Sequence, residues 1–77
     1  MMNETRKTYG ELKIGDIIYW YGALVRIVKI NRVNCEKEDC TYFTIEPYNV
    51  EAIRILGEFY AHGTYGGINK LSVITIN

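Results

Sequence analysis

Apolar and polar residues follow a strand-like pattern through the first half of the chain, most clearly in residues 16–31. Two runs, 17–21 and 24–30, consist mainly of β-branched, aromatic and aliphatic residues, which favour a pleated, half-buried surface. Gly22 stands between the runs, and a glycine in a very short loop supplies the positive φ that hairpin turns need. We therefore predict an antiparallel hairpin folded at Gly22.

The second run of this hairpin is apolar on both faces. Leu24, Val28 and Ile30 alternate with Val25 and Ile27, whereas a two-layer sheet expects one polar face. Strong curvature or a β-bulge would let one strand bury both faces at different points along its length. The pattern therefore predicts a bent strand, and the bend favours a barrel.

Further strands are predicted on either side of a polar segment and at the end of the chain. Residues 40–46 alternate as a strand does, and Pro47 ends that strand because proline cannot donate to a ladder. Residues 34–39, which are mostly acidic or polar, are expected to form an exposed loop. Residues 71–76 are predicted to form a last strand, which would be free to pair with another chain if it lay at an edge.

Residues 50–62 show helical periodicity. Their polar side chains recur at positions 51, 54, 58 and 62, on one narrow stripe of a helix. We expect Asn49 to cap the start of this helix and Gly63 to end it in a left-handed conformation. The remaining arc is apolar and wider than one small sheet can cover, so we expect a loop, the N-terminal segment or a second copy to cover the rest.

The segment before the first long strand carries a short family signature. Lys13, Gly15 and Asp16 form a Lys-x-Gly-Asp lead-in that resembles the opening of SH3-like small barrels, in which the glycine and aspartate serve a turn and have no catalytic role. Residues 1–8 lack periodicity and are expected to be a flexible tail. Residues 9–77 are expected to form one small domain, mainly β with one helix in the order β-β-β-α-β, as an SH3-like barrel or an α+β roll.

Composition narrows the classes of function. The 77 residues, 48% of them hydrophobic, suffice for one core. Nine basic and nine acidic residues give zero formal charge, which argues against nucleic acid as a partner because phosphate-backbone binding usually needs excess positive charge. The chain has no apolar run of membrane-spanning length and no signal-peptide pattern at its start. We expect a cytoplasmic protein that does not act at a membrane.

Cysteine and histidine are the residues most suited to chemistry. Cys35 and Cys40 lie close enough in sequence to cross-link or to share a zinc ion, but four ligands cannot be assembled from them and His62 alone. We therefore expect loop thiols, no metal and no cofactor. His62 can interact with a helix C-terminus and Glu58, and no spacing indicates a nucleophile with its base. We expect that the protein is not an enzyme.

Aromatic residues and a glycine-rich loop are the candidate binding elements. Seven tyrosines and one tryptophan are many for this length, and three consecutive aromatics cannot all face one core. The loop at 63–67 follows a predicted helix instead of preceding one, which argues against a phosphate cradle and leaves chain reversal or a partner-binding loop. The candidate binding residues are Tyr19, Trp20, Tyr21, Arg54, His62, Thr64, Tyr65, Gly66 and Gly67.

These features favour a non-catalytic binding module of the adaptor or inhibitor type that engages a protein partner and associates with itself through the helix or the last strand. One alternative is a small-ligand or nucleotide binder with a pocket at a subunit interface, formed by Tyr65, the glycines, Arg54 and an exposed aromatic residue. A further alternative is weak binding of single-stranded nucleic acid by Arg26, Lys29 and Arg32 beside the aromatic strands.

Overall fold

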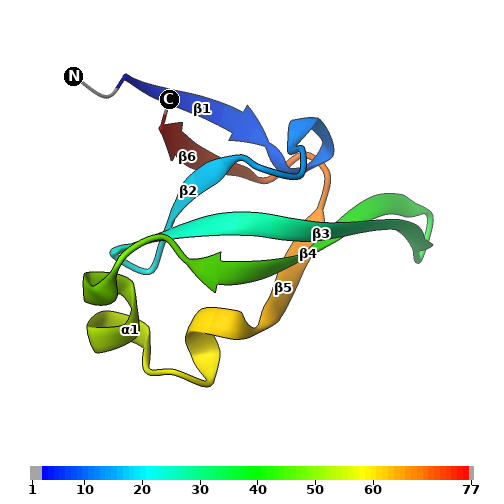
Figure 1. Cartoon of the computed structure of the whole chain (residues 1–77). Helices are drawn as coiled ribbons and strands as arrows, with labels where there is room; N and C mark the ends of the chain where they lie inside the picture. Colours follow the sequence, from blue (N-terminus) through cyan, green and yellow to red (C-terminus); the bar gives the residue numbers. More distant parts are fainter. Residues whose placement is uncertain (1–2, 77) are drawn as a thin grey trace.

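The computed structural model describes residues 3–76 and consists of one six-stranded antiparallel sheet, one short α-helix and two 3₁₀ turns (Figure 1). The elements in chain order are β1 (Glu4–Thr8), η1 (Tyr9–Glu11), β2 (Ile17–Trp20), β3 (Ala23–Cys35), β4 (Glu38–Pro47), α1 (Val50–Leu56), η2 (Tyr60–His62), β5 (Thr64–Ile68) and β6 (Ser72–Ile76). The spatial order of the strands is β1-β6-β2-β3-β4-β5. The prediction of a mainly β protein with one helix is confirmed, but the predicted order β-β-β-α-β is incomplete because it lacks β1 and β5.

The β2–β3 hairpin is the predicted one. Its strands are antiparallel, with Ile18 opposite Val25 and Trp20 opposite Ala23. The two-residue turn is Tyr21-Gly22, whose φ values of 51° and 84° are both positive, as a type I′ turn requires. This turn places Trp20 and Tyr21 at the tip of the hairpin.

A β-bulge in β3 explains why that strand is apolar on both faces. Ile27 pairs with Ile45 but Lys29 pairs with Thr44, so Val28 is the extra residue. Val25 and Ile27 are fully buried before the bulge, whereas Val28 is 40% exposed. The extra residue bends the strand, which confirms the predicted bulge.

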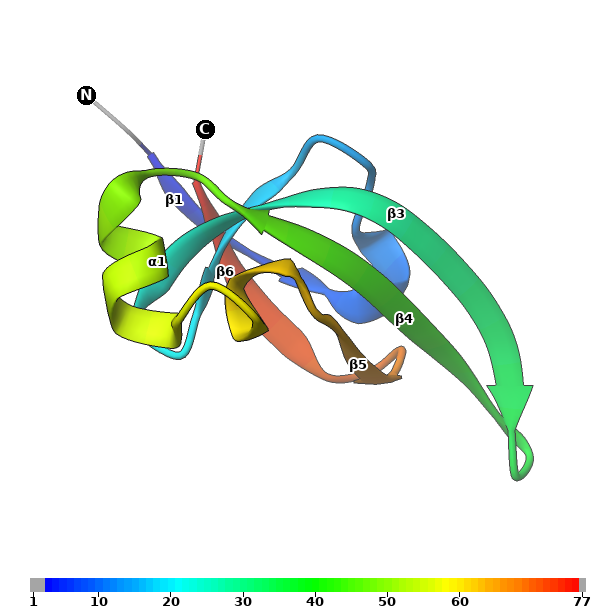
Figure 2. The same ribbon diagram turned by 60° about the horizontal axis from the view of Figure 1, so that its bottom comes forward.

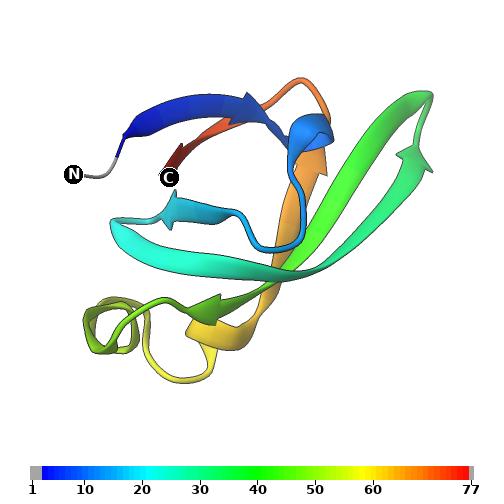
Figure 3. The ribbon, with the colours of Figure 1, turned by 45° about the horizontal axis from the view of Figure 1, so that its top comes forward.

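The sheet curls strongly but does not close. A short turn joins β5 to β6, and η1 packs against this turn (Figure 3). There the Tyr9 amide donates to Leu71 O at 2.7 Å and the Gly10 amide donates to Asn69 O at 3.3 Å. Within residues 3–76, β1 and β5 are the two edges of the sheet and do not pair with each other. Of the two predicted architectures, an SH3-like barrel or an α+β roll, the closed barrel is therefore wrong. Gly15 (φ 98°) and Asp16 do form the turn before β2, and the Asp16 carboxylate accepts from the Lys13 amide at 2.9 Å.

Two polar segments are more regular than their sequence indicates. The expected flexible tail at 1–8 is corrected in part: residues 1 and 2 lie outside the described residues, but Glu4–Thr8 pairs with β6 along its whole length. The expected loop at 34–39 is also wrong, because β3 and β4 continue as a paired arm to the Cys35–Glu38 pair (Figure 2). Glu36 and Lys37 form its two-residue turn with φ values of 46° and 76°. Neither segment has the alternating apolar pattern of a strand, and both are held as strands by backbone pairing with a neighbouring strand.

The helix is shorter than predicted. Gly57, with φ 86°, ends α1 after Leu56, and its amide donates to Ile53 O at 2.7 Å. The helical expectation for residues 57–62 is thus wrong, and only Tyr60–His62 form a separate 3₁₀ turn. Gly63 has φ −81° and is not the left-handed cap. The seven residues of α1 make it too short to span a bilayer, and no helix within 3–76 has the length and apolarity that crossing requires.

The N-cap of α1 is the predicted Asn49, whose side-chain oxygen accepts from the Ala52 amide at 3.0 Å. Replacing Asn49 with alanine is expected to lower the free energy of unfolding by about 1 kcal/mol, because the Ala52 amide loses its side-chain acceptor and keeps only the 3.2 Å contact with the carbonyl oxygen of residue 49. Urea denaturation measures this change. Asn49→Asp retains an accepting oxygen and is the matched control, so equal losses in both variants would contradict the capping role.

Candidate functional site

An apolar concavity lies at the tip of the β2–β3 hairpin, against the helix. It encloses about 380 Å³. Its lining comes from four separate segments and consists of Trp20, Tyr21, Ile55, Leu56, Tyr60 and Tyr65. We call this the aromatic hollow. Its volume lies within the range of about 300–1,000 Å³ typical of ligand pockets.

Trp20 forms the floor of the hollow and links it to the core. Its ring meets Phe43 edge-on at 5.2 Å between centroids, and Phe43 in turn meets Tyr9 at 5.6 Å. On the outer side, the Trp20 ring meets Tyr21 at 5.1 Å and Tyr65 at 5.3 Å. The pairs with Phe43 and Tyr21 are edge-to-face, and the pair with Tyr65 is tilted at 41°. Packed aromatic pairs stabilise a fold beyond simple burial. The floor is therefore held in place from below and from both sides.

Tyr65 closes one wall of the hollow. Its hydroxyl donates to the carbonyl oxygen of Tyr60 at 2.8 Å, which ties β5 to η2. The ring passes directly over Gly63, where a Cβ would lie 2.6 Å from the Tyr65 hydroxyl oxygen. Gly63 therefore makes room for the wall, although it does not end the helix.

Phe59 lies beside Tyr60, one of the lining residues, and is the most exposed large apolar side chain of the described residues at 81%. Its ring packs edge-on against Tyr60 at 5.3 Å. Tyr21 and Tyr60 are 80% and 61% exposed. The aromatic hollow and Phe59 together form what we call the aromatic face.

The structure brings together three of the nine predicted binding residues, namely Trp20, Tyr21 and Tyr65. Tyr19 points to the opposite side of β2, since neighbouring strand residues alternate. Arg54 pairs with Glu51 at 3.3 Å on the exposed side of α1. The His62 ring contacts Glu58 O at 2.9 Å through Nδ1. None of these three side chains lines the hollow.

The remaining predicted residues belong to the β4–β5 ladder. The Thr64 hydroxyl bonds to that of Thr44 at 2.8 Å. At Gly66, opposite Tyr42, a Cβ would overlap the carbonyl oxygen of Thr41. Gly67 packs near Leu71 and Tyr9. The structure thus gives these three residues roles in packing the strands.

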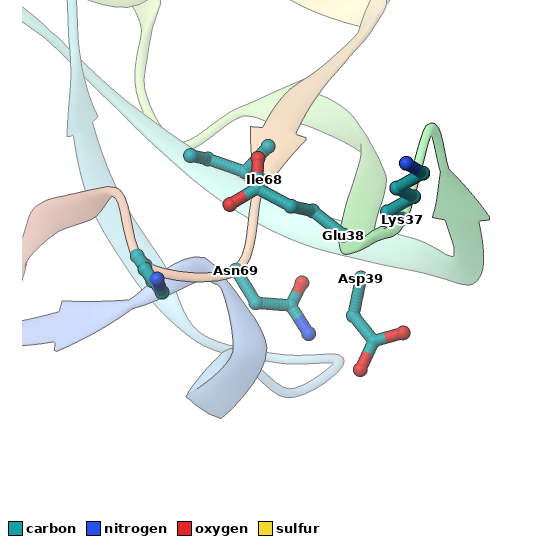
Figure 4. A pocket seen from close by; sticks show the side chains of 6 residues that line it. Lys37, Glu38, Asp39, Ile68 and Asn69 are labelled. Carbon is teal, nitrogen blue, oxygen red and sulfur yellow. The ribbon is translucent and has the colours of Figure 1, made fainter.

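A second, polar hollow of about 330 Å³ lies between the β3–β4 arm and the β5–β6 turn (Figure 4). Lys37 and Lys70 line it together with Glu38 and Asp39, so opposite charges balance. The Asn69 side-chain oxygen accepts from the Thr41 hydroxyl at 2.7 Å, and Asp39 accepts from Asn34 at 3.2 Å. The Asn69 and Asp39 side chains are thus already hydrogen-bonded within the protein. The aromatic hollow is therefore the stronger candidate for a binding site.

Charged groups elsewhere also have structural partners. The Arg26 guanidinium lies 2.9 Å from the Glu46 carboxylate and 5.4 Å from the centre of the Tyr48 ring. Arg32 donates to the carbonyl oxygens of Gly10 and Leu12 at 2.8 and 2.7 Å. Arg26 and Arg32, two of the three basic residues considered for binding nucleic acid, thus already have partners within the protein. Neither of them pairs with the acidic residues at 36–39.

The pKa shifts outside the hairpin arm have local causes as well. The backbone and hydroxyl hydrogen bonds from Thr8 lower the pKa of Glu11. Burial, and secondarily Tyr21, raises the pKa of Tyr9. Within residues 3–76, no three side chains of His, Cys, Asp or Glu gather closely enough to hold a metal ion. The side chains of the aromatic face are aromatic or aliphatic, so this face offers a partner apolar contact and stacking.

The sequence indicated the aromatic residues of the hairpin but not the whole site. Ile55, Leu56, Phe59 and Tyr60 belonged to the wide apolar arc of the predicted helix, and that excess of apolar surface was the available signal. Because α1 ends at Gly57, the chain turns and presents Phe59 and Tyr60 on a second short segment. The break creates the concavity.

Comparison with known proteins gives no family: no family model matches the chain, and no curated protein matches it in sequence.

Proposed function

We propose that the protein is a non-catalytic binding module that engages a protein partner through the aromatic face. The observation that carries this proposal is the combination of a concavity lined mainly by aromatic side chains with an 81% exposed Phe59 beside the lining residue Tyr60. Tyrosine, tryptophan and phenylalanine are the residues enriched at protein interfaces. An adaptor or inhibitor would use such a face without performing chemistry.

The size of the face supports an interface. Aromatic side chains carry about 150–250 Å² each, so Tyr21, Phe59 and Tyr60 at their exposed fractions leave on the order of 400 Å² in contact with water. Exposed patches of a few hundred Å² often mark interaction sites on monomeric proteins. We infer that a partner covers this surface by placing an apolar side chain in the hollow.

Self-association is the form of this proposal that the shape favours. Phe59 projects beside the hollow, so two copies related by a two-fold axis can each insert Phe59 into the hollow of the other. The three exposed rings would supply about half of the roughly 800 Å² per partner that a standard interface buries. The last strand has no part in this pairing, because β6 lies between β1 and β2.

Replacing Phe59 with aspartate is expected to abolish association while leaving the free energy of unfolding of the monomer within about 0.5 kcal/mol of wild type, because this side chain is mostly exposed in the single chain. Light scattering over a concentration series measures self-association. Affinity capture with wild type and variant as matched baits, followed by quantitative mass spectrometry, measures loss of another partner.

Ile14→Asp is the control for that experiment. Ile14 is 67% exposed and precedes β2 at the end opposite Trp20, so the change places the same charge outside the aromatic face. The control should behave as wild type. The proposal fails if Phe59→Asp retains both the oligomeric state and the captured proteins of wild type.

A small-ligand binder is the second candidate, favoured by the volume and aromatic lining of the hollow. Arg54 is not part of that lining, so the hollow suits a flat, uncharged aromatic compound better than a nucleotide phosphate. Thermal shift with such compounds tests this candidate, since a ligand at 100 times its dissociation constant adds about 2.7 kcal/mol of stability. Phe59→Asp should preserve ligand binding, and this separates the two candidates.

We also propose that the sheet is an opened relative of SH3-like small barrels. The Gly15-Asp16 turn and the strongly curled antiparallel sheet support this relationship. The unpaired edges β1 and β5 mark where such a barrel would have closed.

A further inference from the structure

The two cysteines lie on the same face of the β3–β4 arm. Cys35 pairs with Glu38, and Cys40 pairs with Val33. Residues two apart on a strand share a face, so Cys35 and Cys40 are diagonal neighbours on the same face. The polar arm therefore carries a thiol on each of its strands at the same surface.

The contacts of the Cys35 side chain show that it points toward Cys40. Cys35 Sγ lies 3.6 Å from the Tyr42 hydroxyl oxygen, and Tyr42 is the next residue beyond Cys40 on the same face of β4. A contact between Cys35 and Tyr42 therefore brings the Cys35 side chain over toward Cys40. The Cys40 thiol donates to the carbonyl oxygen of Glu38 at 3.9 Å, and interaction with the Cys35 thiol and, secondarily, burial raise the pKa of Cys40 to about 11.

The two thiols differ in access to solvent. Cys35 is partly exposed, whereas Cys40 is only 3% exposed. Both are free thiols. A reagent in solution would therefore meet Cys35 first, and Cys40 would be reached only from Cys35.

We propose that Cys35 and Cys40 form a thiol–disulfide exchange site, at which Cys35 reacts with a low-molecular-weight disulfide such as oxidised glutathione and Cys40 resolves the product. This inference is independent of the aromatic face.

The exchange proceeds in two steps. The Cys35 thiolate attacks one sulfur of oxidised glutathione, the glutathione S–S bond breaks, and one glutathione thiolate leaves. Cys40 then gives up its proton and attacks Cys35 Sγ, which releases the second glutathione thiolate. The two cysteine sulfurs are oxidised to a disulfide, one glutathione disulfide is reduced, and the two protons end on the two glutathione molecules.

The resulting bond should be easy to reduce. Diagonal neighbours on antiparallel strands lie about 7–8 Å apart between Cα atoms, slightly beyond the span of about 4.4–6.8 Å that disulfides usually have. Closing the bond requires extra twist in the arm, which a two-stranded ribbon can supply. Strained disulfides have higher reduction potentials, so the site is reversible.

Trypsin provides a direct measurement because Lys37 lies between the two cysteines. The full chain is incubated with mixtures of oxidised and reduced glutathione, alkylated, digested without reductant and analysed by mass spectrometry. We expect residues 33–37 linked to residues 38–54 by a disulfide, and reduction should separate them. Wild type that stops at glutathione adducts, with no linked peptide, would overturn the proposal.

Two variants test the order of reaction. Cys40→Ser should accumulate the glutathione adduct on Cys35, because the resolving thiol is gone. Cys35→Ser should react at least about tenfold more slowly, because the remaining thiol is buried. Equal rates for the two variants, with circular dichroism showing both folded, would contradict the assigned roles. If either variant is unfolded, the order of alkylation of Cys35 and Cys40 in wild type decides, and prior labelling of Cys40 overturns the proposal.

Discussion

Replacing Gly66 with alanine is expected to lower the free energy of unfolding by at least about 3 kcal/mol, a large part of the stability of so small a protein. A Cβ at this position would overlap the carbonyl oxygen of Thr41 and lie 2.8 Å from Tyr42 Cα. Both are backbone atoms of the neighbouring strand, so no rotamer change relieves the contact. β5 would have to move away from β4, and Tyr65 would move with it.

Urea denaturation of two other glycine variants separates this overlap from simpler effects. Gly22 has a positive φ of 84°, as Gly66 does at 158°, but a Cβ added to Gly22 would meet no atom within 4 Å. Gly22→Ala should therefore cost about 1–2 kcal/mol. Gly67 is adjacent to Gly66, and a Cβ there would meet the flexible Leu71 side chain at 3.1 Å. If Gly66→Ala costs no more than Gly67→Ala, close approach of the two strands is not what requires glycine.

The parts of the fold that the sequence predicted are those with a local chemical cause. Gly22 between two apolar runs predicted the hairpin, apolar residues on both faces predicted the bulge at Val28, and Asn49 predicted the start of α1. Each signal lies within a few residues of the structure it determines. Such features can be inferred without knowing the fold.

The features that were missed depend on distant partners or on turns without a sequence signal. β1 has a polar sequence, and its strand conformation follows from pairing with β6 at the other end of the chain. The arm turn at Glu36-Lys37 takes positive φ values without glycine or asparagine. Gly57 falls inside the helix predicted over 50–62, yet its φ of 86° ends α1 after Leu56.

The candidate site shows the same division. Trp20 and Tyr21 were predicted because three consecutive aromatic residues cannot all face one core, and Tyr65 because it lies in a glycine-rich loop, but neither signal says which of these residues meet. The hollow exists because α1 ends early and because Gly63 admits the Tyr65 ring. Both conditions arise from how separate segments pack, which periodicity does not record.

The support beneath the hollow leads to the second large effect: Phe43→Ala is expected to lower the free energy of unfolding by about 3–5 kcal/mol. Phe43 is fully buried and is the largest such side chain among the described residues. Its removal leaves a cavity directly under Trp20, because the centroids of the Phe43 and Trp20 rings lie 5.2 Å apart. Because Trp20 is the single tryptophan, its fluorescence should shift to longer wavelength as water reaches it, even where the variant stays folded.

Phe59→Ala is the matched control for this prediction, because the same atoms are removed from a side chain that is 81% exposed. At protein concentrations where the chain is monomeric, it should change stability by less than about 0.5 kcal/mol and leave Trp20 fluorescence unchanged. Phe43→Leu, which refills most of the volume, should recover much of the loss. Equal costs for Phe43→Ala and Phe59→Ala would show that the core does not support the floor of the hollow. The opposite result would link the stability of the sheet to the shape of the binding surface, since Trp20 belongs to both.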